Sequence, residues 1–116
     1  GRPRIMCLHG SAGNGRILRA QLQRLLAASE AEVDFVFVDG CFPTGEDNPQ
    51  LPVMRSIFPG EEYLEWTSGR ADDERGWRCY TGLDEGLAHI QELLRRHAPI
   101  DGLLGFSQGS NVASIA

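Results

Sequence analysis

Residues Gly105 to Gly109, Gly-Phe-Ser-Gln-Gly, have the pattern G-x-S-x-G, in which a serine stands on a sharp turn between a strand and a helix. The apolar stretch 100–106 precedes the serine and a helix-like stretch follows it. A glycine on each side lets the two elements approach closely, and the helix N-terminus favours a developing oxyanion. Such a pattern also arises by chance in glycine-rich turns, but its context favours catalysis. We therefore predict that Ser107 is a nucleophile, with Gly105 and Gly109 shaping its turn.

A second stretch, residues 9–11, follows the apolar run at residues 4–8 and contains the triplet His-Gly-Ser. In hydrolases with a G-x-S-x-G turn, the loop after an earlier strand supplies one amide of the oxyanion hole, and the residue after the nucleophile supplies the other. We therefore expect the amide of Ser11 or of a neighbour to act together with the amide of Gln108. Gly10 is expected to shape this loop.

Two other interpretations of the same loop, His9 as a general base and the loop as a phosphate-binding loop, are weaker. His9 lies on the wrong side of Ser107 for proton transfer, so we expect it to shape the loop. The glycines from Gly10 to Gly15 also have a spacing similar to that of a phosphate-binding loop. That loop needs a lysine for the phosphates and a hydroxyl for magnesium, but Arg16 and Ile17 occupy those positions. Nucleotide binding is therefore disfavoured.

Alternating apolar runs and helical patterns predict the elements that position these residues. Strands are expected at 4–8, 33–38 and 100–106, and helices at 15–28, at 83–97 and from 108 onward. Thr81–Asp84 fits a capping box at the start of the second helix, and Pro99 follows its end. The order βαβ, insertion, αβα predicts an α/β fold, a three-layer sandwich with helices on both faces of a mostly parallel sheet.

Residues 40–79 interrupt this pattern with many prolines and glycines and with both tryptophans, Trp66 and Trp77. A long irregular stretch inside a compact domain is usually functional. We expect a lid-like or pocket-forming insertion, in which residues 61–66 form a short strand or a helical turn.

Composition excludes some functional classes. The chain has 116 residues, 41% of them hydrophobic, which suits one small domain or part of one. A formal net charge of −5 disfavours nucleic acid as a partner, and no apolar run approaches the ~20 residues of a membrane span. The chain starts with glycine, so a targeting segment would precede it. Cys7, Cys41 and Cys79 form no C-x-x-C pair, so we expect free thiols and an intracellular, cytoplasmic protein.

Other residues that could do chemistry receive mainly structural interpretations. His89 and His97 belong to the helix before the serine strand, and the helix dipole accounts for His97. Asp39 follows the second strand at the edge where ligands bind, and it either lines a pocket or, as we favour, caps a loop. Cys7 is expected to be buried in a strand, whereas Cys41 stands in a loop at the same edge and could be reactive.

Four segments carry a family resemblance: RIMCLHGSAGNGRILRAQL, VDFVFVDG, YTGLDEGLAHI and IDGLLGFSQGSNVA. They resemble the fungal-type serine hydrolases, a branch of the α/β-hydrolases that includes relatives of the ovarian-cancer-gene-2 protein. The resemblance implies the N-terminal portion of an α/β-hydrolase domain. It also implies an esterase or thioesterase that acts on small-molecule acyl esters through a Ser-Asp-His triad, with no cofactor and no metal.

In that family the acid and the histidine follow the serine along the chain. Only nine residues follow Ser107, and none of them is Asp, Glu or His. The triad partners, together with the C-terminal strands missing from the sheet, are therefore expected beyond residue 116. The alternative is a non-catalytic fragment that serves as a binding or assembly subunit, with a protein partner covering the truncated sheet.

Overall fold

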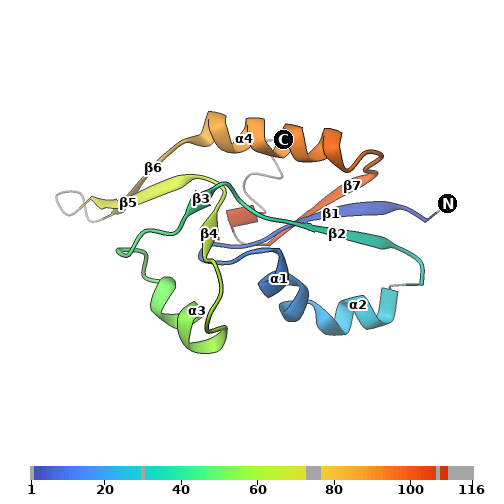
Figure 1. The fold of residues 1–116 in the computed structure, drawn as a ribbon, viewed down its shortest axis with the longest axis horizontal. Helices are drawn as coiled ribbons and strands as arrows, with labels where there is room; N and C mark the ends of the chain where they lie inside the picture. The colour runs from blue at the N-terminus through green and yellow to red at the C-terminus, as the bar shows by residue number, and fades with distance from the viewer. Residues whose placement is uncertain (1, 30, 73–76, 107, 110–116) are drawn as a thin grey trace.

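The structure is a computed structural model that describes residues 2–29, 31–72, 77–106 and 108–109. Its elements follow the chain in the order β1 (Arg4–Leu8), α1 (Gly15–Gln21), α2 (Gln23–Ser29), β2 (Asp34–Val38), β3 (Phe42–Pro43), α3 (Leu51–Ile57), β4 (Leu64–Glu65), β5 (Ser68–Asp72), β6 (Trp77–Thr81), α4 (Leu83–Arg96) and β7 (Gly102–Gly105). Figure 1 shows their arrangement.

The central sheet has the strand order β2-β1-β7, and both pairs are parallel. The register aligns Leu8 of β1 with Val38 of β2 on one side and with Gly105 of β7 on the other. All three strands therefore end at the same edge of the sheet. The loops that follow them carry the histidine-glycine triplet, Asp39 and the serine turn.

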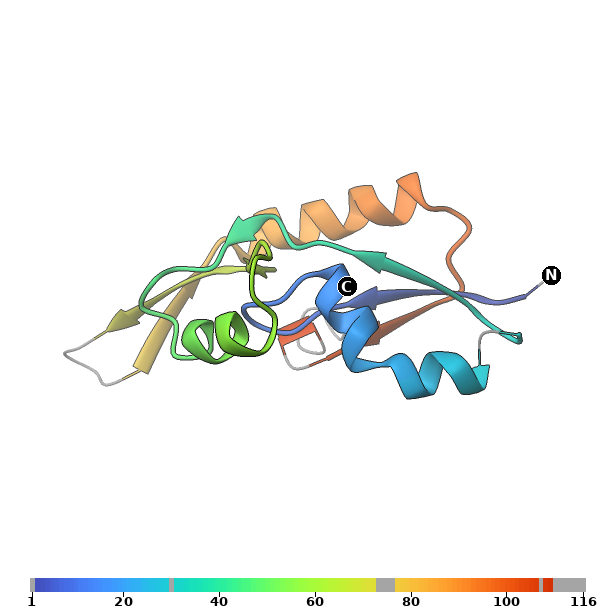
Figure 2. The ribbon, with the colours of Figure 1, turned by 60° about the horizontal axis from the view of Figure 1, so that its bottom comes forward.

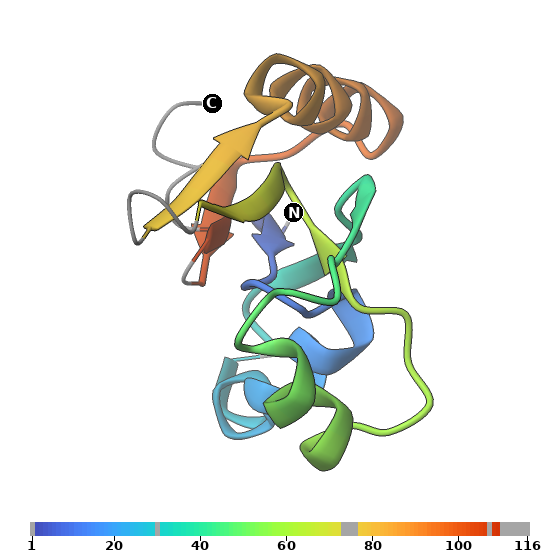
Figure 3. The ribbon, with the colours of Figure 1, turned by 90° about the vertical axis from the view of Figure 1, so that its left-hand side faces the viewer.

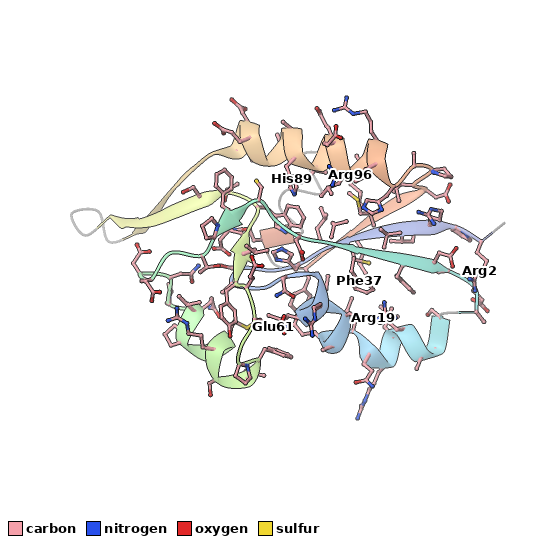
Figure 4. The ribbon with its side chains drawn as sticks, viewed as in Figure 1. Arg2, Arg19, Phe37, Glu61, His89 and Arg96 are labelled. Carbon is pink, nitrogen blue, oxygen red and sulfur yellow. The ribbon has the colours of Figure 1, made fainter. Side chains whose placement is uncertain are left out.

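Helices cover both faces of this sheet. In the views of Figures 1 and 3, α4 lies on one side of the sheet, and α1 and α2 lie on the other. The α4 side holds the main apolar core, formed by Met6, Leu8, Val38, Trp66, Ile90 and Leu93. On the opposite face, the Arg19 guanidinium of α1 lies 5.5 Å from the centre of the Phe37 ring (Figure 4). The predicted α/β layers with a parallel sheet are confirmed.

The predicted helix at residues 15–28 is instead two short helices. Asn14 caps α1 by accepting a hydrogen bond from the Ile17 amide at 2.8 Å, and α1 ends at Gln21, with Leu22 as its C-cap. α1 buries Ile17 and Leu18, whereas α2 buries no residue. The two segments therefore pack differently on the sheet, which the leucine spacing alone does not reveal.

The cap of α4 differs from the predicted capping box, because the N-cap residue is Gly82, with a positive φ of 75°, and not Thr81. A Cβ on Gly82 would lie 2.7 Å from the Phe42 ring, so tertiary packing and backbone conformation both require glycine there. The buried residues of α4 are Gly86, Ile90 and Leu93, while Leu83 is 41% exposed. The helix ends at Arg96, as expected from Pro99.

The stretch between β2 and α4 is largely structured. β3 pairs antiparallel with β4, which confirms a short strand within 61–66. β5 and β6 form an antiparallel hairpin, which extends away from the central sheet in Figure 2. Gly40 packs against the end of β4 so closely that a Cβ would lie 2.4 Å from the Glu65 carbonyl oxygen. This contact fastens the inserted segment to the edge where the parallel strands end.

None of the helices in the described residues is long and apolar enough to cross a membrane. In the same part of the chain, no group of three or more His, Cys, Asp or Glu side chains is arranged to hold a metal ion.

Candidate active site

The turn that carries the G-x-S-x-G pattern packs directly on the end of β1. The Phe106 amide donates to the Leu8 carbonyl at 3.1 Å, and the Gly109 amide donates to the Phe106 carbonyl at 3.1 Å. A Cβ on Gly109 would lie 2.1 Å from the Leu8 oxygen, so only glycine fits. Gly105 ends β7. Ser107, the predicted nucleophile, lies outside the described residues.

His9 is buried, and both of its ring nitrogens are bonded to the backbone. The Gly40 amide donates to Nε2 at 2.9 Å, so Nε2 carries no proton. Nδ1 therefore carries the proton and donates to the Gly10 carbonyl at 2.7 Å. Burial lowers the pKa of His9, which favours this neutral ring. A ring fixed in this way shapes the loop and has no free nitrogen for proton transfer.

Ser11 directs its side chain into a buried network rather than toward solvent. Its hydroxyl donates to Glu65 Oε1 at 2.8 Å and accepts from Asn48 Nδ2 at 2.9 Å. Glu65 Oε2 accepts from the Ala12 amide at 2.6 Å. The Ala12 amide is thus occupied, whereas the Ser11 amide has no hydrogen-bond partner within the described residues. Of these two amides, that of Ser11 therefore remains the candidate donor to an oxyanion.

Trp66 connects the two halves of the predicted oxyanion hole. Its indole Nε1–H donates to the His9 carbonyl at 2.8 Å, and its backbone amide donates to Gln108 Oε1 at 2.7 Å. The Trp66 ring is fully buried, with its centre 4.9 Å from that of His9. Gln108 makes this contact through its side chain. Its backbone amide therefore takes no part in the bond to Trp66.

A pocket of about 200 Å³ lies beside this arrangement. Its walls come from the loop after β1, from the start of the serine turn and from α1 and α3. They are formed by Gly10, Ser11, Gly13, Gln21, Gln50, Met54 and Phe106. The pocket therefore adjoins Ser11. α3, which belongs to the inserted segment, supplies its apolar Met54 side chain.

The other candidates lie apart from this pocket. Asp39 Oδ1 accepts from the Gly15 amide at 2.7 Å and so caps the start of α1. His89 Nε2 donates to the Asp39 carbonyl at 2.7 Å; its place beneath α4 is visible in Figure 4. His97 follows α4, at the end of the helix that leads into the start of β7, and its carbonyl accepts from Arg4.

Neither Cys7 nor Cys41 has an activated thiol. Cys7 is buried in β1, where burial raises its pKa to about 11. Cys41 is exposed, and partial burial of its sulfur still raises the pKa above its ordinary value. Both therefore remain protonated thiols near neutral pH, which disfavours the reactive role considered for Cys41.

Sequence patterns did not identify Glu65, Asn48 or the role of Trp66. Asn48 and Glu65 lie 37 and 54 residues from Ser11 along the chain, and no local spacing connects them. One local signal was present. Glu65 stands between two apolar residues, Leu64 and Trp66, in a segment with strand character, which is an unusual place for an exposed carboxylate.

The sequence is similar to known proteins along its whole length. Residues 1–116 match the family described as Serine hydrolase (FSH1). Among curated proteins, the chain is 30% identical to the dihydromonacolin L-[lovastatin nonaketide synthase] thioesterase of Aspergillus terreus, with 96% of this chain and 45% of that protein aligned. It is also 30% identical to Esterase FUS5 of Gibberella moniliformis, over 97% of this chain and 47% of the relative.

Esterase citA of Monascus ruber is likewise 30% identical, over 97% of this chain and 44% of that protein. The chain thus spans about half the length of the curated relatives it matches. The family match extends over every residue, including the loop after β1 and the G-x-S-x-G turn. As the sequence resemblance predicted, the chain belongs to the FSH1 serine hydrolase family.

Proposed function

We propose that the complete protein is a serine hydrolase that cleaves acyl ester or thioester bonds of small molecules, with Ser107 as its nucleophile. The observation that carries the proposal is the position of Trp66. One residue bonds both the loop that contains Ser11 and the turn that contains Gln108. Two amides held in this way suit the stabilisation of an oxyanion, whose donors must be fixed before charge develops.

In the proposed reaction, Ser107 Oγ gives its proton to a general base and attacks the acyl carbonyl carbon. The amides of Ser11 and Gln108 stabilise the resulting oxyanion. The bond from the acyl carbon to oxygen or sulfur then breaks, and the leaving group takes the proton. Water attacks the acyl-serine, which releases the carboxylic acid and restores the hydroxyl.

The general base is not one of the three histidines of this chain. His9 has both ring nitrogens bonded to the backbone, and His89 donates to the Asp39 carbonyl. His97 follows the C-terminal end of α4, near the start of β7, whereas the serine turn follows the end of that strand. We therefore assign the triad histidine and acid to parts of the protein beyond these 116 residues.

We further propose that the pocket beside Ser11 receives the acyl chain and that the inserted segment, through α3, forms its wall. Met54 offers apolar surface, while Gln21 and Gln50 add polar groups to the lining. This combination suits an acyl chain that is partly apolar.

Labelling with a fluorophosphonate, which reacts with activated serines, tests the proposal. The complete natural protein should be labelled at Ser107, the Ser107→Ala variant should not, and Ser56→Ala, which changes an exposed serine of α3, should label like the wild type. No labelling of the wild type, or equal labelling of Ser107→Ala, would overturn the proposal and favour the non-catalytic binding subunit.

A further inference from the structure

The loop after β1 is held by a carboxylate from a distant part of the chain. Glu65 is 3% exposed and accepts three hydrogen bonds: from the Ser11 hydroxyl and the Asn48 amide at 2.8 Å each, and from the Ala12 backbone at 2.6 Å. Both of its oxygens act only as acceptors, as an ionised carboxylate does. Two of the three bonds hold consecutive residues of the loop.

Ala12 adopts a conformation that alanine normally avoids. Its φ is +54°, in the left-handed region, which costs roughly 1–2 kcal/mol for a residue with a Cβ. The hydrogen bond from its amide to Glu65 offsets this cost. Because Glu65 also accepts from the Ser11 hydroxyl, it restrains Ser11 at its side chain and at the peptide bond that follows it.

Stability alone does not explain a carboxylate at this place. Burying an ionised group is costly unless it is paired, and no ion pair to Glu65 forms within the described part of the chain. Its stabilisation comes from the three donors instead. A neutral glutamine of the same shape would direct an N–H group at one of these donors, so only the carboxylate satisfies all three.

Asn48 fixes the orientation of the network. Its Nδ2 donates to both Ser11 Oγ and Glu65 Oε1, while its Oδ1 accepts from the Gln50 amide at 2.8 Å. The bond to Gln50 prevents Asn48 from exchanging its donor and acceptor without loss. The network therefore also links the loop to the residues that begin α3 and line the pocket.

We propose that Glu65 is a positioning residue for catalysis: through Ser11 and Ala12 it aims the Ser11 amide at the carbonyl oxygen of the substrate. This proposal rests on the proposed hydrolase function and deepens it. Glu65 is buried and does not line the pocket, so in this proposal it acts through Ser11 and Ala12 rather than on the substrate.

The test compares Glu65→Gln with the double variant Glu65→Gln/Asn48→Asp in the complete protein. In the single variant, an N–H group of glutamine meets another donor. In the double variant, the glutamine amide donates to the introduced aspartate, and the aspartate can also accept from the Ser11 hydroxyl. Positions 65 and 48 are then joined as before, with donor and acceptor exchanged between them. Glu62→Gln, an exposed carboxylate of the same segment, is the matched control.

We expect Glu65→Gln to lower kcat by about 10- to 100-fold, somewhat less than the removal of an oxyanion donor, while KM stays within about 3-fold. The double variant should recover most of the lost kcat, and Glu62→Gln should match the wild type. The rate of fluorophosphonate labelling should follow kcat. If Glu65→Gln does not fold, Asn48→Ala, which removes one donor, should give a smaller loss of kcat.

The outcomes separate the two proposals. A wild-type protein that is not labelled at Ser107 refutes the hydrolase function. A labelled wild type with a Glu65→Gln variant of unchanged kcat refutes only the positioning role. A rise in KM without a fall in kcat, or recovery of the melting temperature but not of kcat in the double variant, also refutes it.

Discussion

Gly109 and Leu8 approach so closely that a Cβ on the glycine would stand 2.1 Å from the Leu8 carbonyl oxygen. This contact presses the serine turn onto the end of the strand from which the loop with Ser11 emerges. The two proposed halves of the oxyanion hole therefore owe their proximity to a missing side chain as well as to the hydrogen bonds of Trp66.

Gly109→Ala should separate the serine turn from β1. The added methyl group cannot be accommodated beside two backbone oxygens, so we expect a loss of about 1–3 kcal/mol in the free energy of unfolding and a near-complete loss of fluorophosphonate labelling. Gly102→Ala is the control, because its Cβ would meet only the end of the Ile5 side chain at 3.1 Å. Equal labelling of both variants would contradict the steric argument.

Trp66→Phe should loosen the loop after β1. The change removes the Nε1–H donor, leaves the His9 carbonyl unpaired and creates a cavity, which together should cost about 2–4 kcal/mol in urea-induced unfolding. Tyr63→Phe provides the comparison, since the Tyr63 hydroxyl donates to Phe58 at 2.6 Å in a part-buried place. We expect about 1 kcal/mol there, and a similar cost at both positions would argue against a special role for Trp66.

His9 should make the protein less stable in mild acid. Burial lowers its pKa in the folded state below the ordinary value of 6.5, so the unfolded chain binds its proton more readily. This contribution to stability is fully present above about pH 6.5 and is lost as the pH falls through the lower, folded-state pKa. A protonated ring would also direct Nε2–H at the Gly40 amide.

The measurement for His9 is the difference in unfolding free energy between pH 7.5 and pH 5, for the wild type and for His9→Gln. Glutamine keeps an acceptor for the Gly40 amide but does not titrate. The variant should show a smaller difference between the two pH values. Equal differences would mean that His9 contributes nothing to the acid sensitivity.

Met54→Trp should change the acyl preference of the complete enzyme. The larger side chain fills part of the pocket of about 200 Å³, so kcat/KM should fall for long acyl chains and hold for acetyl substrates. Val53→Trp, on the same helix but 50% exposed, should leave the preference unchanged. A series of acyl esters and thioesters of increasing length measures the shift, and parallel profiles for both variants would exclude α3 as a pocket wall.

The sequence predicted the parts of the fold that depend on local patterns. β1, β2, α4 and β7 carry continuous apolar runs or helical spacing, and the structure places them close to the expected residues. The cap of α4 was not predicted, because the need for glycine at position 82 comes from the Phe42 ring, which lies 40 residues earlier in the chain. Local propensity contains no information about such a contact.

The features of the site also divide into those with a local sequence motif and those that depend on distant contacts. The serine turn and the loop after β1 were recognisable because each carries a short motif with a set order of residues directly after an apolar run. The carboxylate network was not, because Glu65 meets Ser11 only after β4 has paired with β3. Strands of two residues carry almost no periodicity, so the pairing that brings Glu65 to the loop leaves little trace in the sequence.

The bonds of Trp66 also limit how the inserted segment can be exchanged during evolution or engineering. The part from Asn48 to Trp66 supports the loop after β1, so replacing it with an unrelated segment would dismantle the site it borders. The hairpin of β5 and β6 begins only two residues after Trp66 and projects outward (Figure 2). New specificity is therefore more easily grafted onto that hairpin than onto the segment that precedes it.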